Sequence, residues 1–336
     1  MITILLLQII INLLIISKFE LICRLIKLYD LPNNKLKIHK KKMPLVGGVI
    51  VLINLIFLSI ITIGVDKNLY NFSSFNEHVI FIVFLIIFFF IGFYDDKYNL
   101  NPNLKFILSI IFIYTYVNLN ENLLINDIYF SLLEKNINIQ NFSILFTVFS
   151  FLILLNAINF FDGINGQSLI FFIAIFFILL LKTQNELYVY FLIFLSFILF
   201  LNLKNKTFLG DNGIFLLSFI LSTFIIYEYN VLKNIVYADE IFLMLVFPGL
   251  DLLRLTFFRV INKKNPFYGD RNHVHHLLIK KFSLFKSNLI LLSMTLLPYF
   301  TFFIFENFLF SFGTLLFLYL VLILFLQNKI KINKSY

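Results

Sequence analysis

The chain has 336 residues, of which 60% are hydrophobic and 13% charged, and its formal net charge is +9. Soluble domains carry about 25% charged residues, and folding buries at most about three quarters of a chain's surface. A soluble globule could not hide this much apolar surface, so we predict an all-α, polytopic integral membrane protein. The single cysteine, Cys23, excludes a disulfide framework and a cysteine-based metal site.

Apolar stretches recur along the whole chain. A bilayer core requires about 20 apolar residues per helix, and we predict about eleven spans, at residues 2–22, 45–64, 78–94, 105–119, 142–158, 167–182, 187–203, 213–228, 239–258, 288–306 and 309–327. Ten is the alternative count, since the short connection around Asn185 also fits a break in one long hairpin. No basic residue precedes the first stretch, so we expect a spanning helix there rather than a cleaved signal peptide. Residues 1–336 form one predicted membrane-embedded domain.

Lysine and arginine predict the orientation of these spans. Alternate connections, starting with the loop after the first span, collect twenty-one basic residues on one side against four on the other. The positive-inside rule makes the first side cytoplasmic, with the N-terminus outside and the C-terminus inside. Topology thus explains most of the positive charge, and we expect no nucleic-acid partner. In residues 120–141, the longest outer connection, alternating apolar residues predict a small strand pair.

Carboxylates stand at the ends of two predicted spans on the cytoplasmic side. Asp95 and Asp96 end the third span, and two neighbouring acids near lipid are costly unless a cation or proton compensates them. They suit a divalent metal or a general base; a solvated helix end is the alternative. Asp211 lies in a GDNG sequence after the seventh span. It could meet a metal or phosphate, although GDNG is also ordinary turn sequence.

Polar residues with helical spacing close the fifth span. Asn156, Asn159 and Asp162 are three residues apart, which turns them toward one helical face. Gly163 and Gly166 then allow the backbone to turn and approach a ligand closely. A polar cap explains Asp162 but not Asn156, which lies within apolar sequence, so we favour a functional interpretation.

Histidines and basic residues gather in the last large cytoplasmic loop. His273, His275 and His276 follow Asp270 and Arg271. Zinc is one interpretation of such a cluster. Recognition of an anionic substrate is the one we favour, because the neighbouring groups are cationic and no cysteine joins them. Asp251 and Arg254, three apart near the end of the ninth span, fit a simple intrahelical ion pair.

A lysine run and a glycine pair surround the start of the second span. Lys42 ends the run, which could simply hold anionic lipid headgroups, while Pro44, Gly47 and Gly48 allow close backbone packing. Taken together, the cytoplasmic loops supply acids, amides, glycines and cations around one predicted site. Such a set fits phosphoryl chemistry with Mg²⁺, which takes oxygen ligands from one or two carboxylates and from substrate phosphates.

In motif and order, the chain resembles the polyprenyl-phosphate N-acetylhexosamine-1-phosphate transferases over essentially its full length. The matching motifs are PLVGG at 44–48, DD with LxPxxK (Asp95 to Lys105), NxxNxxDG (Asn156 to Gly163), GDxG (Gly210 to Gly213) and DRxHxHH (Asp270 to His276). The HxHH form, preceded by Pro266 and Phe267, is closer to the undecaprenyl-phosphate GlcNAc-1-phosphate transferase branch than to the phospho-MurNAc-pentapeptide transferase branch.

The resemblance implies a reaction and its partners. A UDP-HexNAc and undecaprenyl phosphate would give undecaprenyl-diphospho-HexNAc and UMP, with Mg²⁺ (Mn²⁺ as the alternative), at the bacterial inner membrane. This would be the first membrane step of a cell-surface glycan pathway, such as lipopolysaccharide O-antigen synthesis. A homodimer is compatible with the family.

The resemblance also implies residue roles on the cytoplasmic face. The expected catalytic set is Asp95, Asp96, Asp162, His273, His275 and His276. The expected metal ligands are Asp211, Asp95 and Asp96, and the expected substrate-binding set is Lys42, Lys105, Asn156, Asn159, Gly163, Asn165 and Arg271. In these roles the histidines and Arg271 would hold the diphosphate or the sugar, and the lysines would neutralise phosphate.

Two positions depart from the family pattern. Asn165 stands where a second Asp is usual, and Ile214 where a Ser commonly follows GDxG. These departures leave the donor open, with a deoxy-amino hexose or MurNAc-pentapeptide as alternatives, and they are the only support for an inactive scaffold. A lipid or ion transporter is a further alternative, but it would place charges within spans rather than at their ends.

Overall fold

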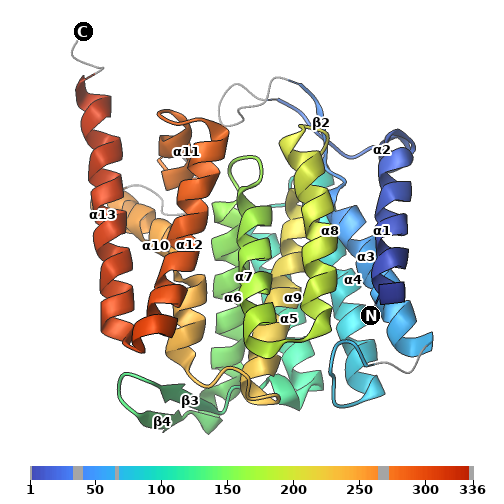
Figure 1. Cartoon of the computed structure of the whole chain (residues 1–336), viewed down its shortest axis with the longest axis horizontal. Helices are drawn as coiled ribbons and strands as arrows, with labels where there is room; N and C mark the ends of the chain where they lie inside the picture. The colour runs from blue at the N-terminus through green and yellow to red at the C-terminus, as the bar shows by residue number, and fades with distance from the viewer. Residues whose placement is uncertain (1, 33–40, 65–67, 264–271, 333–336) are drawn as a thin grey trace.

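The computed structural model describes residues 2–32, 41–64, 68–263 and 272–332, and Figure 1 shows its helices side by side in one bundle. Its helices are α1 Ile2–Ser17, α2 Phe19–Ile26, α3 Gly47–Gly64, α4 Phe75–Tyr98, α5 Pro102–Leu119, α6 Ser143–Phe161, α7 Gln167–Thr183, α8 Glu186–Leu203, α9 Gly210–Asn230, α10 Ala238–Ile261, α11 Val274–Ile279, α12 Leu284–Phe305 and α13 Phe308–Ile332. Short 3₁₀ turns are η1 Glu121–Leu123 and η2 Gln140–Phe142. The strands are β1 Tyr29–Asp30, β2 Met43–Pro44, β3 Asp127–Phe130 and β4 Lys135–Asn138.

The all-α, polytopic prediction is confirmed, and ten of the eleven predicted spans each coincide with one helix. Within the described residues, nine helices are long and apolar enough to cross a membrane on their own. The sixth predicted span, α7, is shorter, at 17 residues. The first is not one helix: α1 and α2 are bent by 69°. Glu20 and Arg24 are exposed on α2, and charged side chains are costly within lipid, so the chain turns at Lys18 instead of continuing.

The connection at Asn185 is a turn between two separate helices. Gln184 adopts a left-handed backbone conformation after α7, with φ of 52°. The Asn185 side chain then accepts a hydrogen bond from the Leu187 amide at 2.9 Å and caps α8. The predicted strand pair is also present, since β3 and β4 pair antiparallel with Ile128 opposite Ile137.

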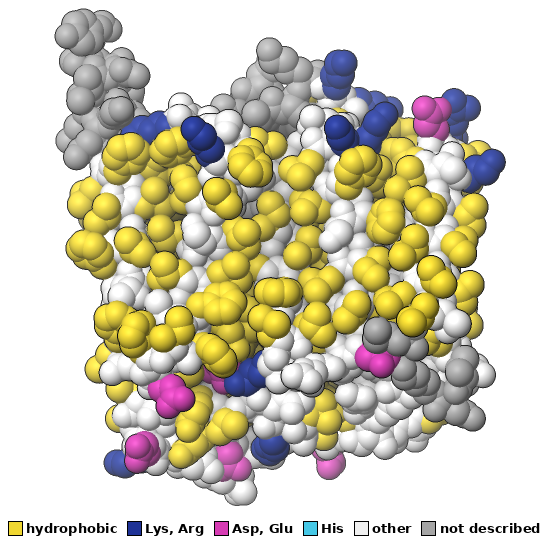
Figure 2. Space-filling model, in the orientation of Figure 1, with side chains coloured by type: hydrophobic (Ala, Val, Ile, Leu, Met, Phe, Trp, Pro, Cys, Tyr) yellow, Lys and Arg dark blue, Asp and Glu magenta, His cyan; other side chains and the backbone are white. Residues whose placement is uncertain are grey.

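Charged side chains lie mainly at the two ends of the bundle. Figure 2 shows a broad hydrophobic belt between them, with Lys and Arg mostly at the end that carries α2 and β2. Acidic side chains lie mostly at the other end in this view. This distribution follows the cost of placing charge in hydrocarbon. Which end faces the cytoplasm stays a prediction from the loop charges.

Helix α9 is the centre of the bundle. In its membrane-spanning stretch 94% of the residues are buried, against 22% for α5 and 28% for α13. Aromatic side chains hold the neighbouring helices against it: the rings of Phe88 and Phe219 stack at 4.7 Å, and Tyr116 lies 4.8 Å from Phe219. The side chains on the first turn of α9 are therefore held in place by several helices at once.

Two glycines let α3 and α4 approach the start of α9 closely. A Cβ atom added to Gly48 would lie 2.6 Å from the Gly213 Cα, and one added to Gly92 would lie 2.6 Å from the Asn212 Cα. The Gly48 amide also donates to the Leu209 carbonyl at 3.0 Å. The close packing predicted at Gly47 and Gly48 is thus confirmed, and its partner is the segment that carries Asp211.

A buried amide cluster fastens α1 to the bundle. Asn12 donates to the Asn54 side chain of α3 at 2.8 Å, and Gln8 donates to the Tyr190 carbonyl of α8 at 3.1 Å. All of these side chains are fully enclosed. Inter-helix amide bonds of this kind hold together helices whose apolar surfaces would be equally stable in lipid.

Replacing Gly48 with alanine tests the close approach of α3 to α9. We expect Gly48→Ala to destabilise the protein by about 1–3 kcal/mol, because the new methyl group overlaps the first turn of α9. Thermal unfolding in detergent measures the loss. Gly64→Ala is the matched control in the same helix, since nothing lies within 4 Å of its added Cβ; equal melting temperatures for the two variants would contradict the prediction.

Candidate functional site

Three acids and one lysine meet at the start of α9, and we call Asp95, Asp96, Lys105 and Asp211 the carboxylate centre. Asp95 and Asp96 are on the last turns of α4, Lys105 on the first turn of α5, and Asp211 on the first turn of α9. Asn101 caps α5 and Pro102 begins it, which turns the chain sharply after α4 and brings Lys105 back beside Asp95. The structure therefore brings together residues that are more than one hundred positions apart.

Asp96 caps helix α9. One carboxylate oxygen accepts the Asp211 amide at 3.0 Å, and the other accepts the Asn212 amide at 2.9 Å and the Asn212 side chain at 2.5 Å. A carboxylate in this place satisfies amides that have no partner within the helix and favours the positive end of the helix dipole. Both oxygens of Asp96 are thus engaged with α9 in this structure.

Lys105 bridges the other two acids. Its ammonium group contacts the Asp95 carboxylate and lies 2.6 Å from the Asp211 carboxylate. The side chains of Lys105 and Asp95 are only 14% and 13% exposed, whereas that of Asp211 is 32% exposed. Asp95 also accepts the Leu100 amide at 2.9 Å. Of the two acids that Lys105 bridges, Asp211 is accordingly the more open to a ligand.

The turn between α6 and α7 carries the amide and glycine motif. Asn156 donates to the Leu152 carbonyl of its own helix at 2.7 Å, and Asn159 is half-buried one turn further along. Asp162 ends α6 and accepts the Ser168 hydroxyl at 2.6 Å. Asn165 donates instead to the Asn205 side chain at 2.6 Å, so it binds the connection between α8 and α9.

The histidine cluster consists of His273, His275 and His276 at the start of α11. The rings of His273 and His275 are parallel at 5.3 Å, and those of His275 and His276 lie 4.3 Å apart. Burial, together with its two neighbouring imidazoles, lowers the pKa of His275 well below its usual value. Its surroundings thus disfavour the protonated, charged form of the ring.

Gly163 joins the histidine cluster to the end of α6. A Cβ atom on Gly163 would overlap the imidazole of His275. The same ring contacts the side chain of Gln167, with 3.3 Å between its Nδ1 and the amide nitrogen. Gly163 is thus needed for the close approach of the His275 side chain. The sequence had indicated only the close approach of a ligand at this glycine.

Asp162 joins the same turn to the carboxylate centre. Asp162 is an exposed residue, and the protein groups on one side of it partly desolvate its carboxyl group. This desolvation raises its pKa to about 6, and the negative charge of Asp211 acts in the same direction. The charge of Asp211 therefore acts on Asp162, and Gly163 next to it contacts His275, so this turn relates the carboxylate centre to the histidine cluster.

Two predicted site residues are not found in this part of the structure: Lys42 lies elsewhere, and Arg271 is not among the described residues. Lys42 lies over the Tyr29 ring at 3.8 Å, next to the β1–β2 pair, and among the described residues it contacts this ring instead of the carboxylate centre. Arg271 lies outside the described residues, as do Pro266, Phe267 and Asp270.

The sequence interpretation missed one contact of Asp251. Its ion pair with Arg254 is present at 2.8 Å, as the spacing indicated. Asp251 also contacts the Nδ1 atom of His273 at 2.9 Å, across 22 residues of sequence. The sequence feature that could have predicted a further partner is the position of Asp251 within an apolar span, since an acid there is uncommon without a partner.

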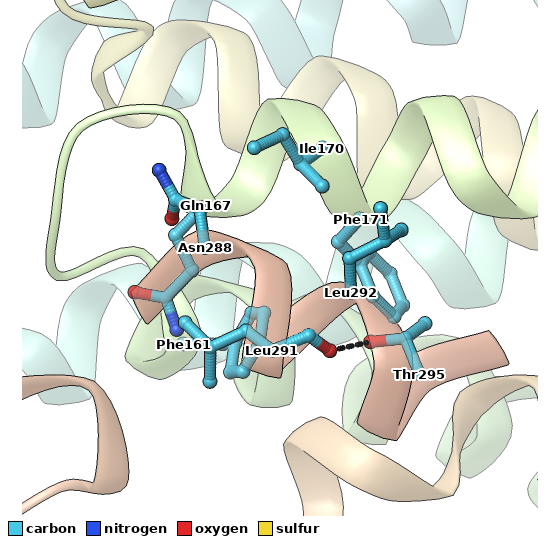
Figure 3. Close-up of a pocket in the computed structure, with 8 residues that line it drawn as sticks. All are labelled: Phe161, Gln167, Ile170, Phe171, Asn288, Leu291, Leu292 and Thr295. Atoms are coloured by element: carbon cyan, nitrogen blue, oxygen red, sulfur yellow. Dashed lines mark hydrogen bonds between the residues drawn. The ribbon is translucent and has the colours of Figure 1, made fainter. Parts of the chain in front are cut away.

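A small apolar cavity lies beside the turn between α6 and α7. It is lined by Phe161, Gln167, Ile170, Phe171, Asn288, Leu291, Leu292 and Thr295. Figure 3 shows the amides of Gln167 and Asn288 at one end and apolar side chains along the rest, with Thr295 bonded to the Leu291 carbonyl. The cavity leaves no room for a water molecule, so we interpret it as a packing gap between α7 and α12.

Known proteins resemble this chain over most of its length. The profile of glycosyl transferase family 4 matches residues 78–228, which contain Asp95, Asp96, Lys105, Asp162 and Asp211. An undecaprenyl-phosphate alpha-N-acetylglucosaminyl 1-phosphate transferase of Thermotoga maritima is 29% identical over 274 residues, which are 80% of this chain and 78% of the relative.

Two further relatives come from different branches. An undecaprenyl-phosphate alpha-N-acetylglucosaminyl 1-phosphate transferase of Escherichia coli O157:H7 is 24% identical over 77% of this chain and 71% of its own length. A phospho-N-acetylmuramoyl-pentapeptide-transferase of Petrotoga mobilis is 26% identical over 73% of this chain and 78% of its own length. The motifs, the helical bundle and these matches thus agree: residues 78–228 are similar to glycosyl transferase family 4, and the chain is similar over most of its length to enzymes that transfer a phospho-sugar.

Proposed function

We propose that this protein transfers a HexNAc-1-phosphate group, GlcNAc-1-phosphate in the first instance, from a UDP-sugar to undecaprenyl phosphate and releases UMP. The observation that carries the proposal is the carboxylate centre, in which a lysine holds two acids together. The names of the relatives support both the lipid acceptor and the amino sugar. The basic loops support a site at the cytoplasmic face of a bacterial inner membrane.

The carboxylate centre fits a divalent cation. Its carboxylates offer oxygen atoms as metal ligands, which Mg²⁺ prefers. The Lys105 ammonium already lies where a positive charge balances Asp95 and Asp211. Asp211 and Asp95 would hold the ion, while Asp96 keeps α9 in place. Bound there, Mg²⁺ would neutralise charge on the phosphates of the donor in the transition state.

The chemistry requires an in-line displacement at phosphorus. An oxygen of the lipid phosphate attacks the β-phosphorus of the UDP-sugar, and the bond from this phosphorus to the oxygen shared with the α-phosphorus breaks, so UMP leaves. Lys105 and the histidine cluster orient the phosphates and spread their negative charge. A phosphate monoester is already a nucleophile, so direct attack needs no covalent enzyme intermediate.

The identity of the sugar depends on the turn after α6. Asn165 replaces an acid of the family pattern, and its side chain binds Asn205. A carboxylate is therefore missing near the donor pocket while the rest of the region is intact. A GlcNAc donor remains our first expectation, and a deoxy-amino hexose or MurNAc-pentapeptide donor would fit the same chemistry.

Asp211→Asn tests the proposed metal-binding role of Asp211. With purified protein, undecaprenyl phosphate, a panel of UDP-sugars and Mg²⁺, we expect the variant to lose UMP release, because an amide cannot supply the anionic oxygen that Mg²⁺ requires. Chelation of the metal should abolish the wild-type activity in the same assay. Asp127→Asn, on β3 at the opposite end of the bundle, is the control and should retain activity. A near-normal rate for Asp211→Asn would remove the proposed metal role.

Lys105→Gln tests whether lysine and metal compete for the same oxygens. Removing the ammonium leaves Asp95 and Asp211 with uncompensated charge, so we expect half-maximal activity at a lower Mg²⁺ concentration. We also expect kcat/KM to fall about 10–100-fold, since one charge-assisted contact to phosphate is lost. A Mg²⁺ titration of UMP release measures both effects. The control is Lys97→Gln at the exposed end of α4; an unchanged Mg²⁺ dependence in Lys105→Gln would contradict the prediction.

A further inference from the structure

Asp251 is a buried acid with an unusually complete set of partners. Its side chain is 4% exposed. One oxygen accepts from Arg254 at 2.8 Å and from the Tyr319 hydroxyl at 3.0 Å, and the other contacts His273 Nδ1 at 2.9 Å and accepts the Val274 amide at 3.2 Å. A carboxylate surrounded by four donors, one of them a guanidinium, is stabilised in its ionised form.

This arrangement selects one protonation state of the His273 ring. An ionised carboxylate can only accept hydrogen bonds, so the proton of a neutral His273 must be on Nδ1. Nε2 is then the nitrogen that carries the lone pair, or that gains the second proton when the ring becomes cationic. The parallel ring of His275, at 5.3 Å, restricts rotation of the imidazole.

Arg254 and Tyr319 hold Asp251 in position from two other directions. Arg254 donates to Tyr319 at 2.9 Å, and it also donates to the backbone carbonyl of Asn272 at 2.7 Å. Arg254 therefore fixes both the acid and the residue that precedes His273. Tyr319 brings α13 into the same group, so three helices and one loop determine where this imidazole lies.

A metal ion is the alternative use of these residues. Ligand atoms of Asp251, His273 and His275 all lie within 4.8 Å of one another. However, Asp251 and His273 are already in direct hydrogen-bond contact, which leaves no room for an ion between them. The guanidinium of Arg254 also supplies the positive charge that a metal would bring. The geometry therefore favours an acid–imidazole pair.

We propose that Asp251 is a positioning residue: it holds His273 in the Nδ1–H form and so directs Nε2 toward the diphosphate of the donor. The role toward the donor rests on the proposed function, but the state of the ring does not. Arg254 and Tyr319 act on His273 only through Asp251 and the adjoining backbone. Orienting acids of this kind matter because they fix which nitrogen meets the substrate.

The protonation state of His273 can be measured without any substrate. In protein labelled with ¹⁵N-histidine, long-range proton–nitrogen correlation spectra distinguish the two neutral forms, and the His273→Gln spectrum identifies the His273 signals. We expect the Nδ1–H form in the wild type and its loss in Asp251→Asn, because an amide can donate as well as accept. An Nε2–H form in the wild type, or no change in Asp251→Asn, would overturn the proposal.

UMP release tests the consequence for catalysis. We expect Asp251→Asn to lower kcat on the order of 100-fold with a smaller change in KM. In a His273→Gln background the same substitution should lower kcat less than about threefold, because paired residues are strongly non-additive. Equal factors in both backgrounds would show that Asp251 acts independently of His273 and would overturn the proposal.

Tyr319→Phe is the milder variant if Asp251→Asn does not fold. It removes one bond to Asp251 without leaving a buried charge unpaired, and its melting temperature in detergent reports its stability. We expect a several-fold loss of kcat that disappears in the His273→Gln background; a loss that persists there would count against the proposal. If the wild type releases no UMP from any UDP-HexNAc, the proposed function fails, and the nitrogen spectra still decide the state of His273.

Discussion

The site depends on the carboxylate of Asp96 at the first turn of α9. Helix α9 is enclosed by its neighbours, so its first amide groups cannot be satisfied by water and need an acceptor from the protein. Asp96 supplies it from α4, and Gly48 and Gly92 remove the side-chain volume that would keep the helices apart. This contact places Asp95 and Asp211 close enough for one lysine to bridge them. Asp96, which the sequence predicted to be catalytic, thus stabilises the start of α9.

Charge balance explains how so many acids persist beside a membrane. Asp95 and Asp211 share the ammonium of Lys105, and Asp251 has the guanidinium of Arg254. A buried charge without such a partner would cost several kcal/mol. The balance is incomplete at Asp211, which remains partly exposed, and that is where an additional cation would be most strongly attracted. The proposed function requires this kind of local imbalance, because substrate and metal would complete the set of charges.

The opposite end of the bundle also carries polar side chains, and these bind one another. Lys182 pairs with Glu240, Tyr188 donates to the buried Glu228 at 2.6 Å, and Asp239 accepts the amide of Ser131 at 2.7 Å. These contacts fasten β3–β4 and α10 to the helices. Acidic groups therefore occur at both ends, and what distinguishes the candidate site is the combination of glycine contacts, imidazoles and an exposed acid.

Sequence alone determined the membrane character, the spans and the motifs, because hydrophobic length and residue type are local properties. It also identified the members of the carboxylate centre and the histidine cluster, although their roles stay predictions. Only the tertiary structure decided how they are used. The cap formed by Asp96 and the His273–Asp251 contact both depend on which helices pack together, and sequence spacing does not encode this. Asn165 illustrates the difference: its motif position pointed to the donor pocket, whereas packing against the α8–α9 connection gave it Asn205 as a partner.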